Sequence, residues 1–131
     1  MIQATALLLT AFLFGGMTLF SAGFAGVLFR TLPSDTAGGV LRAAFPPFYL
    51  FVIVTALAAA ALLWPSDPLG AGALAATAIT TIPARQVLMP AINNATDAGQ
   101  TRRFNLLHGL SVAITLAHIF IAGWVLTRFV L

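Results

Sequence analysis

The stretch Phe104–Leu126, FNLLHGLSVAITLAHIFIAGWVL, runs for twenty-three residues without an Asp, Glu, Lys or Arg. At 1.5 Å per residue it forms a helix of about 34 Å, and the hydrocarbon core of a bilayer is about 30 Å thick. Its length and its lack of charge therefore predict a transmembrane helix.

The whole chain has the same character as this stretch. Its 131 residues are 60% hydrophobic and 7% charged, with a mean hydropathy of +1.03, whereas a soluble domain carries roughly 25% charged residues. We therefore predict an all-α integral membrane protein, a four-helix bundle that forms a single transmembrane domain over residues 1–131. The expected helices cover residues 3–29, 45–64, 69–90 and 104–127.

The arginines predict the direction of these helices. Five of the six flank the first and third connections: Arg30, Arg42, Arg85, Arg102 and Arg103. Only Arg128 lies near the C-terminus, and connections rich in arginine stay in the cytoplasm. Both termini are therefore expected on the outer, periplasmic side, with Trp64 and Trp124 at the outer interface where indole rings are enriched. The prediction is a multi-pass protein of the bacterial inner (cytoplasmic) membrane.

The third expected helix carries the weakest apolar signal and contains Pro83, which removes a backbone hydrogen bond and predicts a kink. Arg85 follows two residues later. Its side chain either extends to the cytoplasmic surface or turns inward to pair with an acid on the same side of the membrane, Asp35 or Asp97.

Several classes of function are excluded by what the chain lacks. It has no cysteine, no Asp or Glu inside an expected span, no glycine-rich phosphate loop and no HExxH motif, so we predict no catalytic residue and no metal site. Its net charge of +3 comes from arginines beside apolar runs. Those arginines are explained by topology, and no binding of nucleic acid is expected.

Polar residues form a stripe on the last expected helix. His108, Ser111, Thr115 and His118 are spaced by three, four and three residues, which places them within an arc of about 80°. One interpretation is that they hydrogen-bond to helix carbonyls and to neighbouring helices. The other is that a histidine ligates haem b. The two histidines lie about 15 Å apart along the axis, so a bis-histidine site would need two subunits, and a His/Met site would need Met89 or Met17.

Small residues are concentrated on the first expected helix. Because helices in lipid associate through close backbone approach, they predict a packing seam that serves the bundle itself or a homo-oligomer. The residues of this seam are Gly15, Gly16, Ala22, Gly23 and Gly26.

Two stretches carry a family resemblance. One runs from Gly15 through VLFRTLP at 27–33 and AG at 37–38 to FPPFY at 45–49, and the other is RFNLLHGLS at 103–111. Together they resemble the family of small four-helix membrane proteins, many of them bacterial domains of unknown function, related to the animal transmembrane protein 205. The residues that match the family pattern are Phe45, Pro46, Tyr49, Arg103, Phe104, His108, Gly109 and Ser111.

The resemblance implies a fold rather than an activity. The chain departs from the pattern at Thr115, where members often have Asn nearby, and before the fourth helix, where Thr101-Arg102-Arg103 replaces an acidic residue of the animal branch. His118 lies outside the pattern, so His108 is the position to test first.

The expected function is that of a non-enzymatic accessory or structural subunit of a membrane complex or homo-oligomer. Its expected partners are the lipid bilayer and other membrane subunits or a second copy of the chain. The alternatives are a haem-binding or redox protein that uses His108 or His118, and a small-solute or metal-ion permeation protein lined by the polar stripe.

Overall fold

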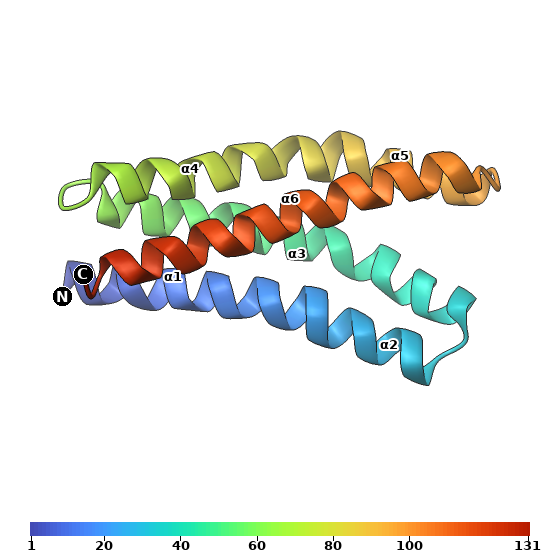
Figure 1. The fold of residues 1–131 in the computed structure, drawn as a ribbon, viewed down its shortest axis with the longest axis horizontal. Helices are drawn as coiled ribbons and strands as arrows, with labels where there is room; N and C mark the ends of the chain where they lie inside the picture. The colour runs from blue at the N-terminus through green and yellow to red at the C-terminus, as the bar shows by residue number, and fades with distance from the viewer.

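The structure, a computed structural model, describes residues 1–131 as four long helices without a strand (Figure 1). This confirms the all-helical four-helix fold. The first and third long helices each contain a short π-helical segment, whose turns are wider than those of an α-helix. The elements are α1 (Ile2–Thr18), η1 (Leu19–Phe24) and α2 (Ala25–Thr31), then α3 (Ser34–Leu63), then α4 (Pro68–Pro83), η2 (Ala84–Leu88) and α5 (Met89–Asp97), then α6 (Thr101–Arg128).

Three of the long helices are long and apolar enough to cross a membrane: Ile2–Thr31, Ser34–Leu63 and Thr101–Arg128. The helix from α4 to α5 does not belong to this set. It is divided by η2 and ends in the polar segment α5. The molecule is a membrane protein whose third long helix differs from the other three.

The boundaries of the helices differ from those expected. The second helix begins at Ser34 rather than at residue 45, and Pro46 and Pro47 lie inside it. These prolines lack N–H groups, but a membrane helix continues through proline where neighbouring elements support the backbone. The third long helix continues past residue 90 to Asp97, and α6 begins at Thr101 rather than at residue 104.

The turn between α5 and α6 depends on one glycine. Gly99 has a φ of +67°, a left-handed conformation that an L side chain rarely adopts. The Gln100 N–H then donates back to the Ala95 carbonyl at 2.9 Å. This hydrogen bond closes the end of α5, and residues 98–100 separate α5 from α6.

The bundle has two unlike ends (Figure 1). Both termini and the α3–α4 turn lie at one end, which we call the terminal end; the α2–α3 and α5–α6 turns lie at the other, which we call the loop end. Towards the loop end, α2 and the start of α3 diverge from α5 and the start of α6. All three buried residues of α6 belong to its second half, and α2 has none.

The core is assembled mainly from the terminal half of the bundle. Alanines on α3 and α4 are fully buried, and their small side chains let the two backbones approach closely. Larger side chains fill the space towards α1 and α6. The largest fully buried apolar side chains are Leu13, Met17, Leu74, Val52 and Val125.

Candidate functional site

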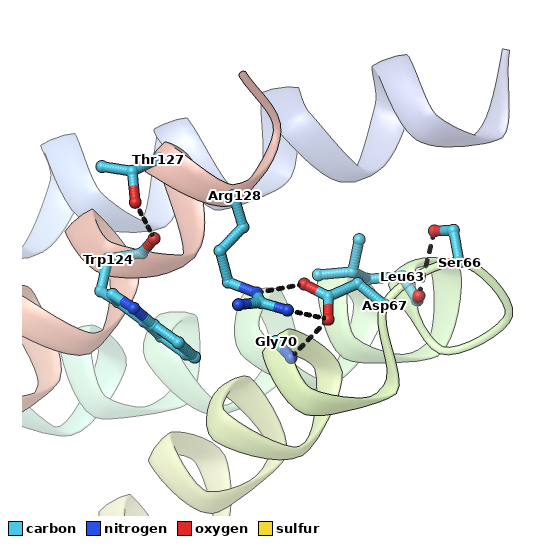
Figure 2. A network of polar contacts seen from close by, with 7 residues as sticks. All are labelled: Leu63, Ser66, Asp67, Gly70, Trp124, Thr127 and Arg128. Carbon is cyan, nitrogen blue, oxygen red and sulfur yellow. Dashed lines mark hydrogen bonds and ion pairs between the residues drawn. The ribbon is translucent and has the colours of Figure 1, made fainter. Parts of the chain in front are cut away.

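The terminal end is closed by an ion pair between the start of α4 and the end of α6 (Figure 2). The Arg128 guanidinium donates through Nε to Asp67 Oδ2 at 2.6 Å and through Nη2 to Oδ1 at 2.7 Å. The Gly70 N–H donates to Oδ1 at 3.1 Å, so Asp67 also caps α4. Arg128 lies over the Trp124 ring, 4.8 Å from its centroid. We call these four residues the terminal clasp.

The clasp changes the acidity of Asp67. Hydrogen bonds from Arg128, and next the one from the Gly70 N–H, lower the pKa of Asp67 from 3.8 to about 2. A cavity of about 130 Å³ lies beside the clasp, with Gln3 and Phe129 in its lining. Both carboxylate oxygens are already occupied by donors, so the clasp acts as a structural lock rather than as a free acid.

A polar contact joins α4 to α6 within the bundle. His118 is buried, and its Nε2 lies 2.8 Å from Thr80 Oγ1. The Thr80 hydroxyl donates to the Ala76 carbonyl at 2.7 Å. Since a hydroxyl has a single hydrogen, this geometry assigns the imidazole hydrogen to Nε2, which donates to Thr80.

The two stretches of the family resemblance meet in space through Tyr49 and Ser111. The Tyr49 and Ser111 hydroxyls lie 3.3 Å apart, which joins α3 to α6. Tyr49 is buried and packs against Phe45, with ring centroids 5.6 Å apart. At the adjacent position of α3, Phe48 stacks on Phe20 of η1, with ring centroids 4.0 Å apart.

Arg85 lies in the same region, on η2, and it has no acidic partner. Its Nε donates to the Pro46 carbonyl at 3.2 Å, and its Nη1 donates to Gln86 Oε1 at 3.3 Å. The expected alternative of an acid is wrong for Asp97, because Arg42 binds that carboxylate at 2.9 Å. Arg85 therefore turns towards α3 and stays half-buried.

These contacts lie at one level of the bundle. Phe20 is seventeen residues from Gln3, which lines the cavity beside the clasp; Pro46 is seventeen residues from Leu63, which also lines it. Each separation corresponds to about 26 Å. Ser111 is seventeen residues from Arg128 and Arg85 eighteen from Asp67. We call the five residues at this level the junction: Phe20, Pro46, Tyr49, Arg85 and Ser111.

The junction is also the level at which the helices are irregular. η1 contains Phe20, η2 contains Arg85, and two consecutive prolines interrupt the hydrogen bonding of α3. π-Helical segments and prolines are the common causes of bends in long helices. Beyond this level, α2 and the start of α3 diverge from α5 and the start of α6 (Figure 1), so the bundle begins to open at the junction.

The predicted polar stripe does not face a single environment. His108 is exposed and stacks on Phe104, with centroids 5.4 Å apart. Ser111 and Thr115 are half-buried, and His118 is buried. The stripe therefore runs from an open surface into the core, and two of its members reach different helices, α3 and α4.

The residues proposed as haem ligands are dispersed. His108 is exposed near the loop end, the Nε2 of His118 is engaged by Thr80, and Met89 is half-buried at the start of α5. No group of three or more His, Cys, Asp or Glu side chains is close enough to hold a metal ion. The haem hypothesis stays a prediction.

The residues of the predicted packing seam differ in what they contact. A Cβ added at Gly16 would lie 2.7 Å from the Phe51 ring, so this glycine permits close packing of α1 on α3. Gly15 has no atom within 4 Å of such a Cβ, and Ala22 is exposed. The nearest atoms to Gly23 and Gly26 belong to Leu19 and Arg30 of the same long helix. Gly16 alone serves the packing within the chain.

Among the remaining residues of the family pattern, Arg103 and Gly109 are exposed, so the pattern gathers at the junction only in part. Sequence reasoning did not identify Thr80, Phe20 or the two ion pairs as contacts. Asp67 followed by Pro68 is a recognisable helix start, but nothing in the sequence indicates that Arg128 binds it.

Comparison with known proteins gives one match. A family model described as a domain of unknown function, DUF4149, matches residues 8–101. This segment covers α3 and α4, most of the first long helix and the turn into α6. No curated protein and no solved structure matches the chain.

Proposed function

Since the chain belongs to the DUF4149 family, a domain of unknown function, we propose that it acts as an accessory or structural subunit that assembles with itself or with another membrane protein. The proposal concerns association of helices in the bilayer and requires no catalytic group. The narrower relation to the animal transmembrane protein 205 stays a prediction, and the proposal does not depend on it.

One observation carries the proposal, an exposed face on the first long helix with heptad spacing. Leu8, Phe12, Gly15, Leu19 and Ala22 follow one another at intervals of four, three, four and three residues, and all five are exposed. This spacing matches the seam of a helix pair, in which side chains of one helix fit between those of the other. We call these five residues the open face of the first long helix.

The composition of the open face favours a helix over lipid alone as its neighbour. Gly15 and Ala22 alternate with the larger Phe12 and Leu19, and small residues at a membrane interface allow two backbones to approach closely. Gly16, next to Gly15, already uses this property against Phe51 within the chain. A second copy of α1 or a helix of another subunit would use Gly15 in the same way.

The charges support a multi-pass arrangement in the bacterial inner membrane with the loop end in the cytoplasm. Five arginines and two aspartates lie in the loop half, whereas the terminal end has Arg128 and Asp67. The formal net charge of +3 is therefore concentrated in one half of the bundle. This distribution is typical of the cytoplasmic side of a membrane protein.

Purification from native membranes in mild detergent tests the proposal. We expect light scattering to give a protein mass, without the bound detergent, above that of one 13.7 kDa chain, or a second chain to co-purify. Gly15→Leu should lower the assembled fraction, because its side chain fills the space that a second backbone would occupy. Gly72→Leu is the matched control, since Gly72 of α4 is also exposed with no atom near its Cβ position.

Two results would contradict the assembly role. One is a wild-type protein that runs as a lone monomer without a co-purifying chain. The other is an equal effect of the two leucine substitutions. The visible spectrum of the same preparation tests the haem alternative, which requires a Soret band that changes in a His108→Ala or His118→Ala variant.

A further inference from the structure

We propose that Arg85 binds the phosphate of an anionic phospholipid at the junction. The guanidinium carries five N–H donors, of which the structure engages one at Nε and one at Nη1. Three donors remain, and the side chain is half-buried rather than enclosed. Arg85 is thus held in place by α3 and is still open to a ligand.

The protein supplies no anion for Arg85. Asp67 and Asp97 are bound by Arg128 and Arg42. Asp35 is eleven residues from Pro46 on α3, about 16 Å along the axis, and Arg85 contacts Pro46. A charged group near the apolar layer normally has a counter-ion or several hydrogen bonds. Arg85 has two hydrogen bonds and no counter-ion within the chain, so an external anion would complete its contacts.

The position of Arg85 along the bundle indicates a lipid headgroup as the source of this anion. Asp67 and Arg85 are eighteen residues apart on the third long helix, about 27 Å, and the hydrocarbon core is about 30 Å thick. With Asp67 at one edge of the hydrocarbon core, Arg85 lies near the other edge, next to the lipid headgroups.

The wide turn of η2 and the charge of the loop end favour this ligand further. η2 contacts both α3 and α6, and the Gln86 side chain beside Arg85 is exposed. A planar guanidinium matches two oxygens of a phosphate. The exposed Arg102 and Arg103 lie at the start of α6, and such charges attract lipids with a net negative charge. An anionic headgroup is therefore preferred over a zwitterionic one.

Native mass spectrometry of the detergent-purified chain, titrated with phosphatidylglycerol and separately with phosphatidylcholine, tests this site. Wild-type protein should retain one phosphatidylglycerol in preference to phosphatidylcholine. Arg85→Gln should weaken that binding about tenfold, the factor expected when one charge-assisted hydrogen bond is lost. Arg102→Gln removes the same charge from an exposed site and should change the binding less than about twofold. Arg85→Lys should fall between wild type and Arg85→Gln, because it keeps the charge without the planar fork.

Each other outcome contradicts the proposal. Equal losses in Arg85→Gln and Arg102→Gln would mean that the lipid is attracted by the general charge of the loop end. Equal retention of the two lipids would remove the anionic preference. Inorganic phosphate that displaces the lipid at millimolar concentration would identify free phosphate as the ligand. If Arg85→Gln does not fold, lipid binding by Arg85→Lys is compared with that of the wild type instead. Unchanged binding in Arg85→Lys would then show that the planar guanidinium is not needed, which contradicts the proposal. Because the measurement counts lipids per chain, failure of the assembly proposal leaves it unaffected.

Discussion

The terminal half and the loop half of the bundle are built from the same four helices in different ways. In the terminal half, fully buried alanines and leucines fill the space between the helices, and the clasp joins α4 to α6. In the loop half, α2 and the first half of α6 contribute no buried residue, and the ion pair Arg42–Asp97 is exposed. The difference indicates that the terminal half contributes more of the packing that stabilises the bundle.

The largest test of this comparison is removal of one leucine from each half. Leu74 of α4 is fully buried, whereas Leu106 of α6 is 68% exposed. Leu74→Ala should leave a cavity and reduce the free energy of unfolding by about 2–5 kcal/mol. Leu106→Ala should change it by less than about 0.5 kcal/mol. Thermal unfolding in detergent measures both. Equal losses would show that the loop half is packed as tightly as the terminal half.

A smaller test compares the two ion pairs. Asp67→Ala removes a helix cap together with the Arg128 contact, and loss of the cap alone costs about 0.5–2 kcal/mol. Asp97→Ala breaks a pair whose side chains are 41% and 61% exposed, and such pairs contribute about 0.2–1 kcal/mol. Chemical unfolding of the two variants should rank Asp67→Ala as the more damaging. The reverse order would mean that the ion pair at the loop end stabilises the protein more than the clasp does.

Acid titration gives a second measurement on the clasp. The hydrogen bonds from Arg128 and Gly70 lower the pKa of Asp67 to about 2. A carboxyl with a lowered pKa in the folded protein stabilises it above the unfolded pKa, and that contribution is lost as the pH falls from about 4 to about 2. The unfolding temperature of the wild type should therefore fall across this range more steeply than that of Asp67→Asn, which still caps α4 but does not titrate. Parallel curves would assign the acid sensitivity to other groups.

The smallest expected effect concerns the junction, where the two halves meet. Tyr49→Phe removes the hydrogen bond to Ser111, which is 3.3 Å long, and hydrogen bonds between membrane helices average about 0.6 kcal/mol. A double-mutant cycle with Ser111→Ala should return a coupling energy of about this size. A coupling energy of zero would mean that this contact does not hold α3 to α6 at the junction.

Much of the fold was predictable because lipid imposes a simple rule on composition. A stretch such as Phe104–Leu126 has to be helical in a bilayer, where every backbone N–H and C=O needs a partner inside its own segment. The start of α3 was mispredicted because Pro46 and Pro47 are usual signs of a helix beginning, and this helix passes through them. Their tolerance depends on neighbouring elements, which a single stretch of sequence does not show.

The candidate site was predictable only residue by residue. The polar spacing of α6 indicated that His118 and Ser111 lie near one face, but their partners Thr80 and Tyr49 come from different helices. Arg85 was expected at the surface or beside an acid, and it contacts a carbonyl of α3. Contacts between segments that are far apart in sequence depend on the rotation of each helix about its axis, and apolar composition all round a helix does not specify that rotation.

The sequence by itself determined that this protein is helical, apolar and embedded in a membrane, because the small number of charges and the length of the apolar runs permit nothing else. The tertiary structure decided which of those helices pack and which faces stay open. It packed Gly16 against Phe51 and left Gly15 uncovered, and it paired Asp67 with Arg128 while Arg85 kept free donors. The physical reason is that lipid solvates every apolar face equally well, so close packing and the few polar contacts alone select one arrangement.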